Sequence, residues 1–133
     1  MSSIIAVVKE IQNCDSLNIV KFEFNNQVLS MMSLDLNEDI KVGTKVKLLA
    51  KSSHIAIGKN YSGEISYSNQ LQVTIDSIEN GKLLSSINLK YFDTILESII
   101  TISSSKKMNL KVGDNVIAFI KASELSISEI LND

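Results

Sequence analysis

The sequence predicts an all-β protein of two tandem small barrels, and two observations carry this prediction. The first is an internal repeat: turn segments of the first half return in the second half in the same order, 70 residues later, so that Gly43 returns as Gly113. The second is the alternation of β-branched and other apolar residues with polar ones over short runs, which is typical of half-buried strands. We therefore expect two domains, at residues 1–60 and 66–133.

The repeated segments are short but lie in one register. They are Ile40-Lys41-Val42-Gly43 with Leu110-Lys111-Val112-Gly113, and Lys51-Ser52-Ser53 with Lys121-Ala122-Ser123. Toward the N-terminus the best offset falls to about 67 residues, and we attribute this to a longer hairpin at residues 91–94 of the second copy. A chance match of two common turns is the alternative.

Each copy is expected to contain five short strands and one helical turn. Asn25-Asn26 and Asn80-Gly81 are tight-turn signals between apolar runs. Strands are expected at residues 4–11, 19–24, 73–75, 83–91 and 95–102, with a further strand after each Lys-Val-Gly turn. Helical turns are expected at residues 34–39 and 105–110.

Such an element set predicts a small closed barrel of OB type in each copy. Half-chains of this size bury little core on their own, so we expect strands to be exchanged or packed between the units. In the segment 116–121 both faces of the strand are apolar. We expect Ile117 and Phe119 to face a neighbouring chain, and packing within the monomer is the alternative.

Composition excludes several classes of function. The 133 residues carry 13 basic and 15 acidic side chains, every basic one a lysine, for a net charge of -2. A weakly acidic chain without arginine is poorly suited to grip a nucleic-acid backbone. One cysteine and one histidine leave no cysteine-based or paired-histidine site for a free metal cation. No apolar run approaches the roughly 20 residues that span a bilayer, so we expect a cytoplasmic protein without a membrane partner.

Four segments of the second copy resemble, in order, the motifs of Mop domains. They are Ser66-Tyr67-Ser68-Asn69-Gln70-Leu71, Ile100-Thr101-Ile102-Ser103-Ser104, Leu110-Lys111-Val112-Gly113 and Ile120-Lys121-Ala122-Ser123. Two copies in a short chain resemble the molbindins, the di-Mop members of the TOBE-type molybdate- and tungstate-binding proteins. The resemblance implies OB-like barrels, an assembly of six Mop units (a homotrimer for this chain) and oxyanions held between units.

The chain departs from the Mop pattern in two places. Ser68 stands where the family has arginine, and the first-copy counterpart of Thr101 to Ser104 reads Met31-Met32-Ser33-Leu34 at the offset of 70, without hydroxyls at the aligned positions. Sites built from the first copy are therefore expected to differ from those built from the second.

Molybdate and tungstate are tetrahedral dianions, and they need hydrogen-bond donors together with positive charge. Hydroxyls and backbone N–H groups donate, and a lysine ammonium adds a compact charge. Lys51 and Lys121 are therefore the first candidates, and His54 and Glu124 are expected to be surface residues. The full set of expected oxyanion-binding residues is Lys51, Ser52, Ser53, Ser66, Tyr67, Ser68, Asn69, Thr101, Ser104, Lys121, Ala122 and Ser123.

The expected function is reversible capture of molybdate or tungstate for storage, homeostasis or delivery, without catalysis, since no nucleophile–base pair is apparent. An oxyanion-sensing subunit that acts on a repressor or an ABC importer is the alternative. An OB-type nucleic-acid binder is a remote one, because only 5% of the residues are aromatic. The choice between molybdate and tungstate, and whether a molybdopterin cofactor is also held, stay open.

Overall fold

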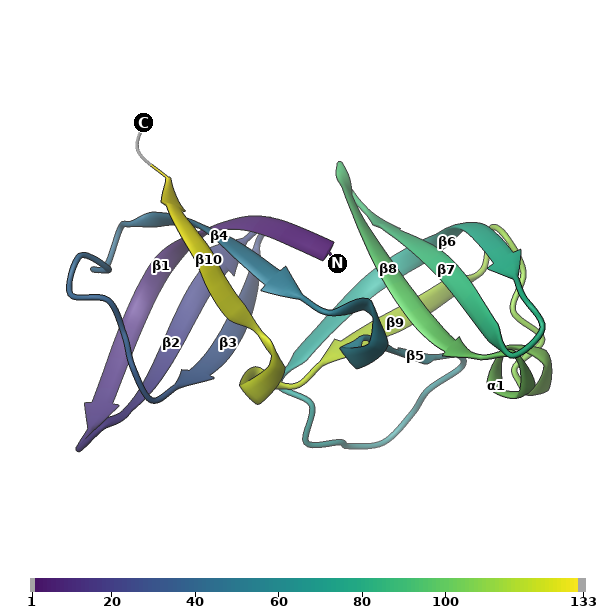
Figure 1. Cartoon of the computed structure of the whole chain (residues 1–133), viewed down its shortest axis with the longest axis horizontal. Helices are drawn as coiled ribbons and strands as arrows, with labels where there is room; N and C mark the ends of the chain where they lie inside the picture. Colours follow the sequence, from purple (N-terminus) through teal and green to yellow (C-terminus); the bar gives the residue numbers. More distant parts are fainter. Residues whose placement is uncertain (1, 132–133) are drawn as a thin grey trace.

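Two antiparallel sheets of five strands each make up the computed structural model, which describes residues 2–131 (Figure 1). The strands are β1 (Ser2–Cys14), β2 (Leu17–Phe24), β3 (Gln27–Ser33), β4 (Lys45–Ala50), β5 (Ala56–Gly58), β6 (Asn69–Asn80), β7 (Leu84–Tyr91), β8 (Thr94–Thr101), β9 (Asn115–Ile120) and β10 (Ser126–Leu131). One helix, α1 (Ile102–Lys107), and two 3₁₀ turns, η1 (Ser52–His54) and η2 (Ala122–Glu124), complete the described elements. This confirms the predicted all-β class.

The two copies exchange their fifth strands. The strand orders are β10-β4-β1-β2-β3 and β5-β9-β6-β7-β8. Strand β5 follows η1 in the first copy but pairs with β9 of the second, and β10 follows η2 but pairs with β4 of the first. The predicted exchange is confirmed. The ranges 1–60 and 66–133 remain a prediction for the chain, since each sheet takes one strand from the other range.

The repeat is visible in the geometry of each Lys-Val-Gly turn. Gly43 and Gly113 have φ angles of 96° and 94°, a region that glycine enters without strain. Their N–H groups donate to the carbonyls of Val8 and Ile75, each at 2.8 Å. Both acceptors lie beside the bulge of the first strand of their copy. The turn therefore closes on the bulge in both copies.

The prediction of a longer hairpin at residues 91–94 is wrong. Phe24 pairs with Gln27 in the β2–β3 hairpin, and Tyr91 pairs with Thr94 in the β7–β8 hairpin, so both hairpins have two-residue turns. The offset therefore stays at 67 through β8, and the three extra residues of the second copy lie between β8 and β9. The counterpart of Thr101 is consequently Leu34, which corrects the alignment that placed Thr101 against Met31.

This insertion explains where a helix forms. Thr101 caps α1, because its Oγ1 accepts a hydrogen bond from the N–H of Ser104 at 3.1 Å. The helix thus begins three residues before the predicted segment 105–110. No helix forms at residues 34–39, where Leu34 cannot cap and the Asn37 side chain accepts a bond from the N–H of Asp39 at 2.8 Å instead.

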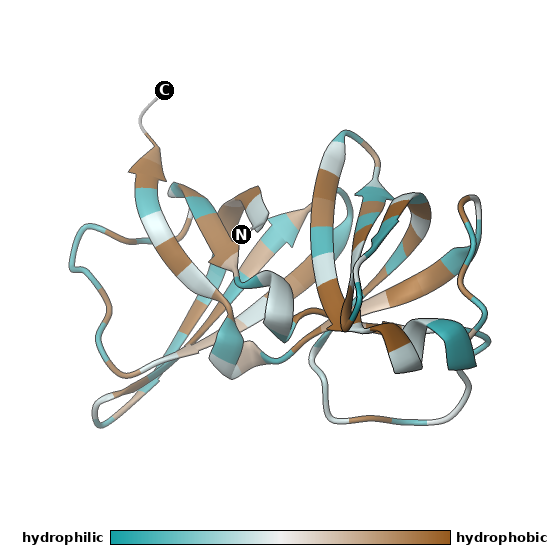
Figure 2. Ribbon diagram, turned by 45° about the vertical axis from the view of Figure 1, so that its right-hand side comes forward, coloured by the Kyte–Doolittle hydropathy of each residue, from teal (hydrophilic) through white to brown (hydrophobic). Residues whose placement is uncertain are grey.

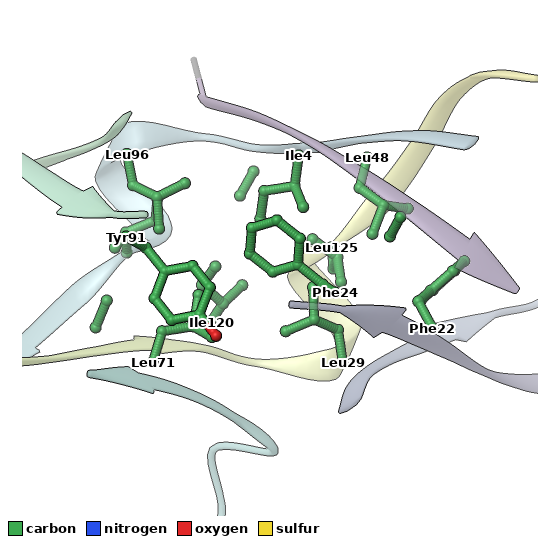
Figure 3. Close-up of a cluster of buried hydrophobic side chains, with 14 of the residues drawn as sticks. Ile4, Phe22, Phe24, Leu29, Leu48, Leu71, Tyr91, Leu96, Ile120 and Leu125 are labelled. Atoms are coloured by element: carbon green, nitrogen blue, oxygen red, sulfur yellow. The ribbon is translucent and has the colours of Figure 1, made fainter. Parts of the chain in front are cut away.

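One hydrophobic core runs through both halves (Figure 3). Apolar residues alternate with polar ones along the strands, as Figure 2 shows, so that one face of each strand points inward. Phe24 and Tyr91 meet between the halves with ring centroids 5.1 Å apart. The labelled side chains around them, from both sheets, are buried: Ile4, Phe22, Leu29, Leu48, Leu71, Leu96, Ile120 and Leu125.

The expectation that Phe119 faces a neighbouring chain is wrong. Its side chain is 3% exposed, because Tyr61 and Tyr67 of the connection between β5 and β6 cover its ring, with centroids 5.3 and 5.7 Å away. A Cβ added at Gly58 would come within 2.6 Å of the Phe119 ring, so glycine there permits the close approach. Ile117 is half-buried beside β5.

Candidate functional site

The turns η1 and η2 approach each other in the middle of the molecule, where the end of β4 faces the start of β10 (Figure 1). Each turn follows the fourth strand of its copy and begins after a lysine with extended backbone, Lys51 or Lys121. His54 Nδ1 lies 2.7 Å from Glu124 Oε2. These two residues hold equivalent positions at the offset of 70, so the contact relates the copies by a pseudo-twofold axis.

A second set of equivalent contacts supports the same axis. The Asn69 amide bonds the main chain of Ser30 on β3, accepting from the N–H at 2.7 Å and donating to the carbonyl at 3.0 Å. Its counterpart Ser2 accepts a bond from the N–H of Glu97 on β8 at 2.7 Å. Asn69 is fully buried, so its side chain joins the two sheets and does not face solvent.

A hollow of about 240 Å³ lies on one side of the His54–Glu124 pair. We call it the lysine hollow, because Lys51 is the one lysine among its lining residues. Lys51 comes from the first copy and Ser123 from the second. Its lining is Leu49, Lys51, His54, Ser123, Glu124, Leu125 and Ser126.

A second hollow of about 300 Å³, the tyrosine hollow, lies on the other side of the pair. Most of its lining is the pseudo-twofold counterpart of the lysine hollow, but Tyr67 lies there and Lys121 does not. Its lining is Ser53, His54, Ile55, Ala56, Tyr67, Ile99, Ile100 and Glu124. The two hollows therefore differ in charge although their backbones correspond.

Turn η1 is held to β8 by a carboxylate. Ser52 Oγ donates to Glu97 Oε1 at 2.8 Å, and Ser86 Oγ donates to Glu97 Oε2 at 2.6 Å. These bonds, Ser86 first and then Ser52, lower the pKa of the Glu97 carboxyl. The second copy has Ala122 in place of Ser52. The hydroxyl proton of Ser52 is thus committed to Glu97 and is not offered to a ligand.

The remaining expected residues are not among those that line the two hollows. Thr101 and Ser104 bond each other at the start of α1, at the outer end of the second half, with their Oγ atoms 3.0 Å apart (Figure 1). Ser66 and Ser68 are exposed in the connection before β6. Of the twelve expected residues, the structure brings Lys51 together with Ser123, and Ser53 together with Tyr67.

His54 and Glu124 were expected at the surface, and both line the two hollows. Their side chains are 39% and 27% exposed. The signal that could have found them is their equivalence in the repeat combined with opposite charge. Within residues 2–131 no group of three histidine, cysteine or acidic side chains is arranged to hold a metal ion. The helix of this part of the chain is also too short to cross a membrane.

Comparisons with known proteins agree with this architecture. The model of the TOBE domain family matches residues 65–127. Among solved structures, the chain is similar to the cytoplasmic molybdate-binding protein ModG with molybdate bound, at 22% identity over 95% of both chains and a TM-score of 0.88. A molybdate-binding protein from Sporomusa ovata is 36% identical over 53% of this chain and all of its own, with a TM-score of 0.47.

A comparison with curated proteins finds no match. The family model and the ModG fold confirm the resemblance drawn from the four sequence motifs and the tandem OB-like architecture. Residues 65–127 of the chain therefore form a TOBE domain, and the chain as a whole has the tandem OB-like fold of ModG.

Proposed function

We propose that this protein binds molybdate or tungstate reversibly in the lysine hollow. One observation carries the proposal: Lys51 and Ser123, from different copies, line the same small hollow. Among residues 2–131, no ion pair or hydrogen bond engages the Lys51 ammonium. A cation and a hydroxyl donor are thus available at one point between the two units.

The chemistry of these groups fits a tetrahedral dianion. Lys51 supplies a positive charge with three N–H donors, and the Ser123 hydroxyl rotates to donate. Hydrogen bonds to a charged group contribute about 1.5–3 kcal/mol each, whereas micromolar binding needs about 8 kcal/mol. Lys51 and Ser123 alone fall short of this, so a further donor is needed in the hollow.

The biological role follows by analogy with the protein of the same fold. ModG is a cytoplasmic molybdate-binding protein, and we extend this to storage, homeostasis or delivery of the oxyanion in the cytoplasm by the present chain. Capture of this kind makes and breaks no covalent bond, so the proposal assigns no catalytic residue. It assigns no site to molybdopterin or to nucleic acid.

The proposal includes a homotrimer of six Mop units. Three exposed apolar side chains support it: Ile5, Val7 and Ile95 line a further hollow of about 700 Å³ between β1 and the β7–β8 hairpin, together with charged and polar residues. Exposed apolar groups gathered around a hollow are typical of surfaces that associate. Light scattering during gel filtration tests this; three times the 14.7 kDa chain mass is expected, and a monomer at micromolar concentration contradicts it.

Titration calorimetry tests the binding site itself. Lys51→Ala is expected to weaken tungstate and molybdate binding by about tenfold or more, since it removes a charged donor. Lys121→Ala is the matched control, because this lysine holds the equivalent place but does not line the hollow; its effect is expected to stay within about twofold. Absence of binding heat for the wild type, or an equal loss in both variants, overturns the proposal.

A further inference from the structure

We propose that His54 is a ligand of the oxyanion and that the lysine hollow takes up a proton on this ring together with the dianion. This inference rests on the proposed function. The His54 ring supplies the third donor that the hollow needs, because it lines the hollow together with Lys51 and Ser123.

The contact with Glu124 fixes the role of each ring nitrogen. Nδ1 lies 2.7 Å from Glu124 Oε2, so it carries the proton that the carboxylate accepts. In the neutral ring Nε2 then has only a lone pair, which repels an anion; in the charged ring Nε2 carries a proton and donates. The ring therefore becomes a donor to a bound oxyanion only when it is protonated.

Charge in the hollow leads to the same conclusion. With neutral His54, the Lys51 ammonium and the Glu124 carboxylate cancel, and a dianion gains no net attraction. A proton on His54 makes the lining positive by one charge. Glu124 thus disfavours an anion in the unprotonated site and stabilises the charged ring in the protonated one.

The titratable groups around His54 from each packed element are few. Glu124 faces it from η2, Lys51 precedes it on its own turn, and Tyr67 shares the tyrosine hollow with it. On β8, packed against η1, the one such group is Glu97, whose carboxylate already accepts two hydroxyl bonds. Strand β3, packed against η2, carries no ionisable side chain.

A pH dependence of binding can be assigned to one side chain in this sequence. His54 is the single histidine of the 133 residues, and histidine is the side chain that ordinarily changes charge between about pH 5 and 8. If binding requires the charged ring, the affinity must fall by up to about tenfold per pH unit once the free ring is neutral. Any pH dependence that comes from the ligand itself appears equally in a variant without His54, so such a variant separates the two sources.

The experiment compares the whole chain with His54→Gln by calorimetric titration with tungstate from about pH 6 to about pH 8.5. Two buffers of different ionisation heat report the protons taken up on binding. For the wild type we expect affinity to fall about tenfold or more across the range, with a fractional proton taken up near neutral pH. For His54→Gln we expect no slope, no uptake, and affinity at low pH close to that of the wild type at high pH.

Each outcome decides between the two proposals. Wild-type binding without a slope, or a slope kept in His54→Gln, overturns the role of His54 and leaves the oxyanion site standing. No binding at any pH overturns the proposed function instead.

A second variant, Glu124→Gln, decides the matter if His54→Gln does not fold. The amide oxygen of the new glutamine still accepts a hydrogen bond from the His54 ring N–H, while the substitution removes the negative charge from the lining of the hollow. We expect binding about threefold tighter or more at high pH, as a like charge is removed; unchanged affinity overturns the inference.

Discussion

Phe24 and Tyr91 are equivalent residues of the two copies, and their rings touch each other at the junction, with centroids 5.1 Å apart. Tyr91 also donates its hydroxyl to the carbonyl of Asn25 in the first copy at 3.2 Å. A contact between equivalent residues lies on the pseudo-twofold axis, as His54 and Glu124 do. The same axis therefore runs through the core and the candidate site, so the packing of the halves determines the geometry of the hollows.

Removing the ring of Phe24 is expected to destabilise the whole chain. Phe24 is 5% exposed, and Phe24→Ala should lower the free energy of unfolding by about 3–5 kcal/mol. Phe92→Ala is the control, because Phe92 is 66% exposed and touches the edge of Tyr91 with centroids 4.8 Å apart; its cost should stay near 0.5–1.5 kcal/mol, roughly that of an aromatic pair. Urea denaturation measures both, and equal losses would show that the junction is not a core.

Tyr91 makes the free energy of unfolding depend on pH in the alkaline range. Burial raises the pKa of the Tyr91 phenol above its ordinary value of 10.0. Its contribution to stability is thus fully present below about pH 10 and is lost as the pH rises through the higher pKa of the folded state. The difference in unfolding free energy between wild type and Tyr91→Phe is expected to shrink above about pH 10. A constant difference would contradict the buried phenol.

The Ser52–Glu97 hydrogen bond makes the free energy of unfolding depend on pH in the acidic range. Its stabilisation is lost as the pH falls, whereas that of Tyr91 is lost as the pH rises. Hydrogen bonds from Ser86 and Ser52 lower the pKa of Glu97 below its ordinary value of 4.5. The stabilisation is therefore present above that value and is lost as the pH falls through the folded-state pKa. Ser52→Ala should lower the unfolding free energy by about 1 kcal/mol at neutral pH, and the loss should diminish toward acidic pH.

Ser53→Ala is the matched control for Ser52→Ala, since Ser53 is the exposed neighbour. Its effect on unfolding free energy is expected to stay within about 0.5 kcal/mol. Equal effects of the two variants, measured by urea denaturation at several pH values, would rule out the proposed role of Glu97.

Thr101 is expected to act as a helix cap and not as a ligand. Thr101→Ala should cost about 1 kcal/mol of stability, because the N–H of Ser104 loses its acceptor, while tungstate affinity should be unchanged. Thr101→Ser should retain both properties. A tenfold loss of affinity in Thr101→Ala, seen by calorimetry, would return this residue to the site as the sequence motif predicts.

Local patterns were enough to predict most of the fold. The β-branched, apolar run of residues 4–11 and the Asn25-Asn26 turn specify their strands and hairpin without reference to the rest of the chain. The helical turn at residues 34–39 could not be excluded in this way. Its absence depends on Leu34 occupying the capping place of Thr101, and that equivalence is visible only once the register of β3 and β8 is known.

The candidate site was harder to predict because it depends on contacts between the copies. The repeat identified Lys51 and Lys121 as equivalent, yet Lys51 lines the lysine hollow whereas Tyr67, and not Lys121, lines the tyrosine hollow. Asn69 looks like a donor in the motif and is instead bonded to Ser30, 39 residues away. Neither distinction can be read from residues that are neighbours in sequence.

Anomalous scattering of tungsten in crystals grown with tungstate tests most directly whether the lysine hollow binds an oxyanion. We expect a tungstate ion in the lysine hollow, with its oxygens within hydrogen-bonding distance of Lys51 Nζ and Ser123 Oγ. A tungstate bound only elsewhere, for example between Thr101 and Ser104 at the start of α1, with the lysine hollow empty, would contradict it.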